Sequence, residues 1–222
     1  MNSLVRLIQS GSTAEIADAV ELDPALVEYR DPQGVSALMW AIYAGQPMVR
    51  DFFATRMAAH GVPLDLFEAA ALGDAARVEA ILAADPAAVS AFSGDGWTPL
   101  HLAAAFGSPA AARVLLDHGA SVDTVSANPQ RNQPLHAALA LGRNPEVIEL
   151  LLDRGANADA SQVAGFTPLF SAAAANRRDL AELLLRHGAK AHHANDDGKT
   201  PAIYARERGH AELASWLESL PA

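Results

Sequence analysis

Two histidines and two aspartates near the C-terminus form the densest group of metal-binding residue types in the chain. His192 and His193 are followed by Asp196 and Asp197, and zinc takes imidazole and carboxylate ligands when they converge on one point. Adjacent residues on a turn point apart, so we do not expect these four side chains to converge. We therefore predict no metal site, with a small-ligand or metal-binding protein that uses this cluster as an alternative.

Nucleophilic and phosphate-binding chemistry both lack their usual motifs. The sequence has no Gly-x-Ser-x-Gly string, with which many hydrolases expose a nucleophilic serine, and it has no Cys to supply a thiolate. Gly94, Asp95 and Gly96 form a two-glycine turn and match neither the P-loop nor the dinucleotide-binding pattern. The sequence thus nominates no catalytic residue and no cofactor, and we expect a protein that is not an enzyme.

Composition and charge narrow the possible partners. The 222 residues include 16 basic and 26 acidic side chains, a net charge of -10, and no basic stripe is present to replace the counterions of nucleic acid. The longest apolar run, residues 37–44, is far shorter than the roughly 20 residues of a membrane span, and the N-terminus lacks the features of a signal peptide. With the absence of Cys, these features predict a cytoplasmic protein that binds neither nucleic acid nor membrane.

The excess of Arg over Lys and the abundant Ala suggest a bacterial genome rich in GC.

One short string that contains a histidine recurs along the chain. TPLH, QPLH, TPLF and TPAI begin at Thr98, Gln133, Thr167 and Thr200, at spacings of 35, 34 and 33 residues. Self-similarity at such a period is the signature of a repeat protein. Because the position of His101 holds His136, Phe170 and Ile203 in the other copies, we interpret this histidine as structural and not as catalytic.

Each copy of the repeat predicts two short helices. Thr98 suits a helix N-cap, Pro99 suits the first helical position, and Gly107 suits the left-handed conformation that ends a helix. These signals predict helices over residues 99–106 and about 109–118, followed by an extended turn. Helices of this length are not stable alone in water, so neighbouring copies must stack.

The first quarter of the chain follows the same plan without the TPLH string. Pairing each residue with the one 62 positions later matches Asp23-Pro24 with Asp85-Pro86, and Gly34 with Gly96, without a gap. We therefore expect the solenoid to begin near the N-terminus and to have no interior domain boundary.

TPLHLAAAFG at 98–107, followed by VLLDHGAS at 114–121, resembles an ankyrin repeat. The resemblance covers nearly the whole chain and implies an all-α solenoid, a single ankyrin-repeat domain over residues 1–222. It implies seven helix-turn-helix units at about 3–29, 30–61, 62–92, 93–127, 128–161, 162–194 and 195–220. It also implies that His101 and His136 hydrogen-bond near the Thr side chain and the backbone of the neighbouring loop.

Three departures from the repeat pattern carry predictions of their own. The second unit continues past its expected helix end through residues 52–61, so its second helix should be longer. Arg131 takes the position of the usual turn Gly, which predicts an altered hairpin tip. Glu218 replaces the Leu of internal units, giving the polar outer face of a terminal cap and thus predicting a complete solenoid.

Stacked repeats present a concave surface suited to docking another folded protein. We therefore expect a monomeric module for protein–protein interaction that scaffolds, inhibits or escorts a folded partner, with a secreted, host-directed effector as the alternative. The resemblance places the variable contact positions beside the turn Gly and near the end of each first helix. Ten residues are our candidates for partner binding: Gln33, Val35, Tyr43, Asp95, Trp97, Phe106, Asn132, Leu141, Phe166 and Lys199.

Overall fold

A computed structural model describes residues 3–141 and 144–221, with the side chain of Leu141 outside this description. Its helices come in seven pairs. The pairs are α1 (Ser3–Ser10) and α2 (Thr13–Leu22), α3 (Ala37–Tyr43) and α4 (Pro47–Ala59), α5 (Leu66–Leu72) and α6 (Ala75–Ala84), α7 (Pro99–Phe106) and α8 (Pro109–Asp117), α9 (Pro134–Leu141) and α10 (Pro145–Asp153), α11 (Pro168–Ala174) and α12 (Arg178–Arg186), and α13 (Pro201–Glu207) and α14 (Ala211–Glu218). The all-α solenoid is confirmed. None of the described helices is both long and apolar enough to cross a membrane.

The predicted helix signals act as expected in the unit that contains α7. The Thr98 side chain accepts a hydrogen bond from the His101 backbone, Pro99 occupies the first turn, and Gly107 ends the helix with a φ of 77°. α4 is the predicted longer helix, with 13 residues. The Asp-Pro sequences of the first and third units begin single turns of 3-10 helix, η1 (Pro24–Glu28) and η2 (Pro86–Ser90), and the Asp side chain caps each turn.

Hairpin-like loops, here called fingers, precede most of the first helices. One backbone bond closes each finger: Asp31 N donates to Val35 O, Ser93 to Trp97, Ser126 to Asn132, Gln162 to Phe166 and Asn195 to Lys199, at 2.8–2.9 Å. Finger 126–132 is two residues longer than the others, and Arg131 within it adopts a left-handed φ of 46°. The altered tip that Arg131 predicted is therefore an extended finger that keeps the usual closing bond.

The third unit has no finger. Residues 60–65 lead directly from α4 into α5, so fingers 31–35 and 93–97 become neighbours, with Gly94 against the Gln33 carbonyl. A side chain at Gly94 would overlap the Gln33 oxygen. Glycine thus permits the close approach of two backbones here.

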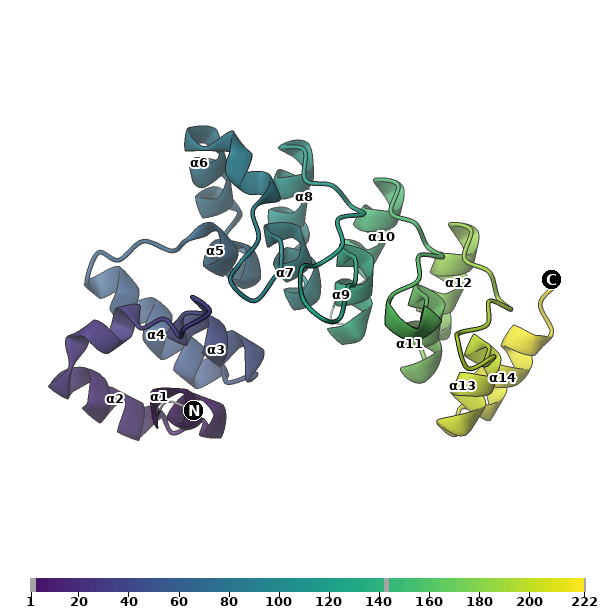
Figure 1. Cartoon of the computed structure of the whole chain (residues 1–222), viewed down its shortest axis with the longest axis horizontal. Coiled ribbons are helices and arrows are strands. Elements are labelled where there is room, and N and C mark those ends of the chain that lie inside the picture. Colours follow the sequence, from purple (N-terminus) through teal and green to yellow (C-terminus); the bar gives the residue numbers. More distant parts are fainter. Residues whose placement is uncertain (1–2, 142–143, 222) are drawn as a thin grey trace.

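The stacked units form an arch (Figure 1). The first helices α7, α9 and α11 lie along its inner side, and the second helices α6, α8, α10 and α12 form the outer row. A hydrophobic core runs through the stack from Leu4 to Leu217, and the second helices contribute fully buried side chains to it at Leu82, Leu115, Leu151 and Leu184. The outer row is interrupted between α4 and α6, which lie apart in Figure 1.

Candidate protein-binding surface

The recurring histidines belong to the frame of the solenoid, as predicted. His101 is fully buried; its Nδ1 lies 2.7 Å from Thr98 Oγ1 and its Nε2 lies 3.0 Å from the Asn132 carbonyl oxygen of the next finger. The Asn132 carbonyl oxygen can only accept, and the Thr98 backbone N–H donates to Nδ1 at 3.4 Å, so the network assigns the proton to Nε2. Burial lowers the pKa of His101 to about 4, which keeps the ring neutral near pH 7.

His136 repeats this arrangement one unit later. Its Nε2 lies 2.9 Å from the Ala160 carbonyl oxygen, and the Gln133 backbone donates to its Nδ1 at 3.3 Å. Burial lowers the pKa of His136 as well. In both rings Nδ1 bonds to the N-cap residue of its own helix and Nε2 bonds to a backbone carbonyl oxygen further along the chain, so both nitrogens are engaged in the frame.

Glu68 occupies the same position in the third unit, and the sequence analysis missed it. Its carboxylate is fully buried, accepts from the Asp65 backbone at 2.9 Å and lies 3.4 Å from an Arg30 nitrogen, while Arg30 also pairs with Asp65 at 2.9 Å. Burial, followed by repulsion from Asp65, raises the pKa of Glu68. The Asp-x-x-Glu pattern at 65–68 is a capping box and could have predicted the helix start, but not the pairing with Arg30.

The two histidines of the C-terminal His-Asp cluster bond to different parts of the chain. His192 Nε2 lies 3.0 Å from the Leu220 carbonyl oxygen, and His193 Nδ1 lies 3.3 Å from an Asp159 oxygen. Within residues 3–141 and 144–221, no three His, Asp or Glu side chains are grouped so that they could hold a metal ion. The geometry gives no support to the alternative of a metal-binding protein.

The ten candidate contact residues fall into different environments. Gln33 is exposed, and six others are half-buried: Tyr43, Asp95, Trp97, Phe106, Phe166 and Lys199. Val35 and Asn132 are each only 7% exposed, which favours structural roles for both. Val35 packs into the core and the Asn132 backbone closes its finger. The side chain of Leu141 lies outside the described residues.

The four candidate aromatic residues lie in three separate ring clusters. Tyr43 stacks on Phe106 with ring centroids 6.1 Å apart, which joins α3 to α7 across the third unit. Phe166 packs against both Phe170 and Tyr204, at 5.1 and 5.5 Å. Trp97 contacts the ring of His101 at 5.5 Å. These rings are thus partly engaged within the protein, and each keeps some exposed surface.

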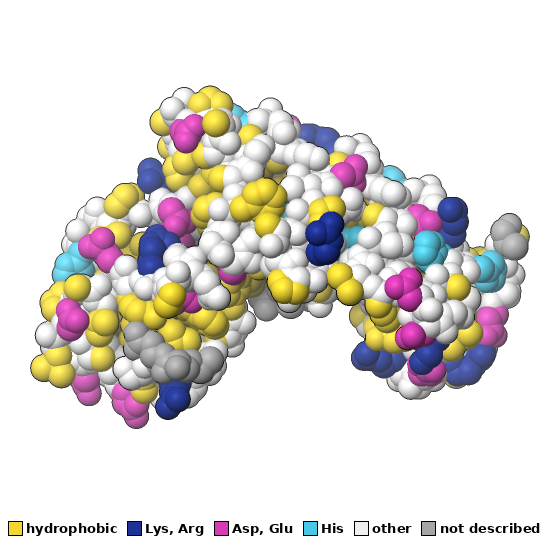
Figure 2. Space-filling view, viewed as in Figure 1, with side chains coloured by type: hydrophobic (Ala, Val, Ile, Leu, Met, Phe, Trp, Pro, Cys, Tyr) yellow, Lys and Arg dark blue, Asp and Glu magenta, His cyan; other side chains and the backbone are white. Residues whose placement is uncertain are grey.

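Exposed hydrophobic side chains also lie along the fingers, and the sequence analysis missed Phe92 and Val125 among them. Phe92 and Val125 precede two successive fingers and are 46% and 39% exposed, and Val163 lies within finger 162–166 at 54% exposure. Ile203, in the position of His101, is 38% exposed. The arch is hollowed on its lower side, and hydrophobic side chains gather over the N-terminal helices and recur along the lower edge (Figure 2).

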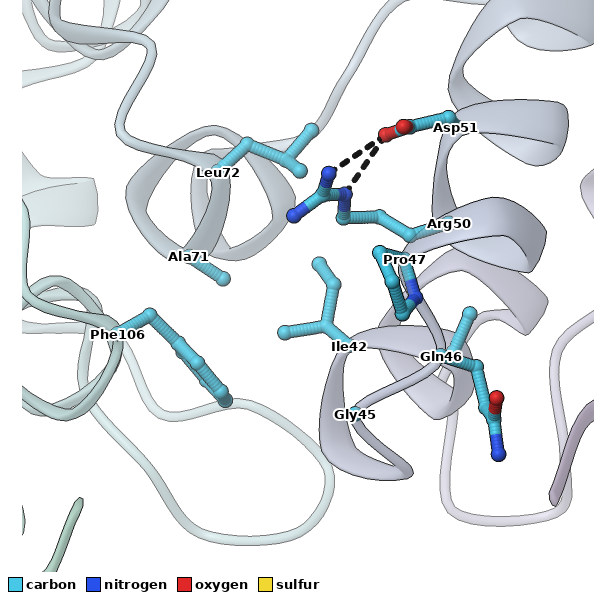
Figure 3. A pocket seen from close by; sticks show the side chains of 10 residues that line it. Ile42, Gly45, Gln46, Pro47, Arg50, Asp51, Ala71, Leu72 and Phe106 are labelled. Carbon is cyan, nitrogen blue, oxygen red and sulfur yellow. Dashed lines mark hydrogen bonds and ion pairs between the residues drawn. The ribbon is translucent and has the colours of Figure 1, made fainter. Parts of the chain in front are cut away.

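A cavity of about 540 Å³ lies between the second and third units (Figure 3). Ile42, Leu72 and Phe106 line it together with Pro47 and Ala71, and the ion pair of Arg50 with Asp51, 2.7 Å apart, lies at its edge. The described residues that line this cavity include no nucleophile with an adjacent base. The cavity therefore lacks the arrangement of side chains that nucleophilic catalysis requires.

Stacked pairs of short helices joined by fingers define a helical-repeat solenoid with an open inner face. The family profile described as ankyrin repeats (3 copies) matches residues 66–162 and 143–219. The chain therefore belongs to the ankyrin repeat family, as the TPLH strings predicted. Ankyrin repeats are a general protein–protein interaction module, and the family is typically non-enzymatic.

Three curated proteins illustrate the similarity. The chain is 36% identical over 163 residues to human neurogenic locus notch homolog protein 4, a match that covers 72% of this chain and 7% of that protein. It is 46% identical over 94 residues to rice probable E3 ubiquitin-protein ligase XBOS31, and 43% identical over 86 residues to human ankyrin repeat and SOCS box protein 18. These matches cover 42% and 39% of this chain, and 20% and 18% of the relatives. The chain thus matches a fifth or less of each relative's length.

Proposed function

We propose that this chain is a non-enzymatic, monomeric module of the cytoplasm that binds a folded protein through the concave face of the arch and thereby scaffolds, inhibits or escorts it. One observation carries the proposal: large apolar side chains stay exposed along the fingers, at positions where the frame does not require them. Phe92, Val125 and Val163 are each more than a third exposed. Exposed apolar patches on a folded protein commonly mark interaction sites.

Aromatic side chains at the same face give the proposed interface its strongest contacts. Trp97 and Phe166 each line a cavity beside a finger. Aromatic residues dominate binding energy at interfaces, and truncation of one can remove on the order of 2 kcal/mol. With a net charge of -10, the chain favours a partner whose contact surface is basic or mixed.

Affinity purification from the native organism with mass spectrometry identifies the partner, and two double variants test the face. We expect Trp97→Ala with Phe166→Ala to abolish recovery of the partner. Leu22 and Met48, 89% and 70% exposed, lie outside the fingers and provide the matched control Leu22→Ala with Met48→Ala, which should keep full recovery. Equal recovery with the first pair and the wild type would refute this face.

A further inference from the structure

Finger 93–97, which lies against finger 31–35 because the third unit has no finger, borders two cavities. The two cavities, of about 130 and 530 Å³, share Phe92, Ser93, Gly94 and Asp95 in their walls. We call the combined space the finger cleft. Gln33 and Trp97 line its larger part, and Pro129 of the extended finger 126–132 adds a further wall. The cleft thus follows from two departures from the repeat, one missing finger and one long finger.

Negative charge exceeds positive charge around the finger cleft. Asp65 and Asp95 line its smaller part, and the buried carboxylate of Glu68 lies behind Asp65. Arg30 is the cation of this part, and it already pairs with Asp65 and Glu68. Across the described ranges Asp95 has no ion-pair partner, although its Oδ1 accepts from Ser93 Oγ at 2.6 Å. Burial, followed by the charge of Asp95 and the hydrogen bond between the Tyr43 and Asp95 side chains, raises the pKa of Tyr43.

Aromatic surface lies beside the Asp95 carboxylate. Trp97 lines the larger cavity next to Asp95, and Phe92 is 46% exposed at the boundary between the two cavities. A guanidinium group stacks on an aromatic ring and also forms a fork of hydrogen bonds to a carboxylate. A lysine ammonium offers a point charge without the planar stacking surface.

We propose that the finger cleft binds an arginine side chain of the partner protein, with the guanidinium between the Trp97 indole and the Asp95 carboxylate and the aliphatic stem along Phe92. The proposal rests on the proposed function and adds the chemistry that the partner must present. The matched control is Asp197, which takes the same position in finger 195–199, where Lys199 replaces Trp97.

The test uses the whole chain and three tripeptide amides, Gly-Arg-Gly, Gly-Lys-Gly and Gly-norleucine-Gly, followed by ¹H–¹⁵N NMR. We expect Gly-Arg-Gly to shift the Trp97 indole resonance and the amides of residues 93–97 saturably, with lysine weaker and norleucine without effect. Asp95→Asn should weaken arginine binding by about fivefold or more, whereas Asp197→Asn should leave it unchanged. Unchanged dispersion of the other amides confirms that each variant is folded.

Three outcomes would overturn the assignment: no saturable shift at residues 93–97, equal binding of norleucine or lysine, or full arginine binding by Asp95→Asn. These outcomes are independent of partner capture. If a partner is captured through the concave face while the peptides fail, the arginine site alone is wrong. If the peptides bind and no partner is found, the proposed function fails instead.

Discussion

Thr98 and Thr167 are the N-cap residues of equivalent helices, but only the Thr98 hydroxyl forms hydrogen bonds within the described residues. Thr98 Oγ1 lies 2.7 Å from His101 Nδ1 and caps the helix. Thr167 is fully buried, and its Oγ1 has no hydrogen-bond partner in the described part of the chain. Phe170 stands where His101 would, so the ring that would satisfy Thr167 is missing. The repeat thus retains a cap residue whose partner has been replaced.

Replacing each threonine by valine should separate these two cases. We expect Thr98→Val to lower the free energy of unfolding by about 2 kcal/mol, because it removes the helix cap and the hydroxyl that hydrogen-bonds to the buried His101 Nδ1. Thr167→Val should be neutral or stabilising by up to about 1 kcal/mol, because it removes an unsatisfied buried hydroxyl. Urea unfolding followed by circular dichroism measures both. Equal losses from the two variants would contradict the structural difference.

His101 should make stability depend on pH. Burial lowers its folded pKa to about 4, below the ordinary 6.5, so the unfolded chain binds the proton more readily. The stabilisation is therefore complete above pH 6.5 and is lost as the pH falls from 6.5 toward 4, by on the order of 3 kcal/mol.

The variant His101→Gln tests this dependence, since glutamine cannot titrate in this range. Unfolding free energies at pH 7.0 and pH 4.5 should differ less in His101→Gln than in the wild type. His187→Gln, at an exposed histidine, should keep the wild-type difference. A wild-type slope in His101→Gln would show that other groups cause the acid sensitivity.

At the scale of elements, the helices were predictable and the loops only in part. Thr98, Pro99 and Gly107 fix α7 by local capping and φ preferences, so the predicted range 99–106 matches the structure. The missing third finger depends on which loops become neighbours after stacking, and sequence spacing did not reveal it. Val35 is the last residue of its finger, as Trp97 is of the next, yet Val35 packs into the core. The exposure of a side chain at this position depends on the neighbouring finger, and the sequence alone does not say which finger that is.

Finger 126–132 offers a prediction at this scale. Arg131 has a φ of 46°, which costs a residue with a Cβ roughly 1–2 kcal/mol. Arg131→Gly should therefore raise the free energy of unfolding by about 0.5–1 kcal/mol, after the added flexibility of the unfolded chain is deducted. Gly96 takes the equivalent position in finger 93–97, with a φ of 85°. Gly96→Ala should lower the free energy of unfolding, because the added Cβ would lie 2.8 Å from the Ala127 carbonyl carbon. Thermal unfolding of both variants should show opposite signs, and a loss of stability in Arg131→Gly would refute the strain.

The whole molecule is a row of units in which stability depends on contacts between neighbours. We expect the weakest of these junctions to lie between the second and third units, because one finger is missing there, α4 and α6 lie apart and a cavity of about 540 Å³ remains. The Tyr43–Phe106 stack and the pairing of Arg30 with Asp65 and Glu68 cross this gap. The sequence predicted one continuous solenoid, but it gave no measure of how strongly each pair of neighbours is coupled.

We expect α1–α4 to unfold at a lower free energy than α7–α10, because less apolar surface is buried across the weak junction. Native-state hydrogen exchange at increasing denaturant reports this free energy for each helix.

Arg30→Ala should lower the unfolding free energy of α1–α4 by about 1 kcal/mol, because it leaves the buried Glu68 carboxylate without its cation. The loss is modest because solvent screens the half-exposed Arg30. Arg154→Ala is the matched control, because Arg154 pairs with Asp117 at 2.8 Å across a closed junction on the surface; it should change the value by less than about 0.5 kcal/mol. Exchange of all helices through one common opening, or an equal effect of both variants on every helix, would show that this junction is as strong as the others.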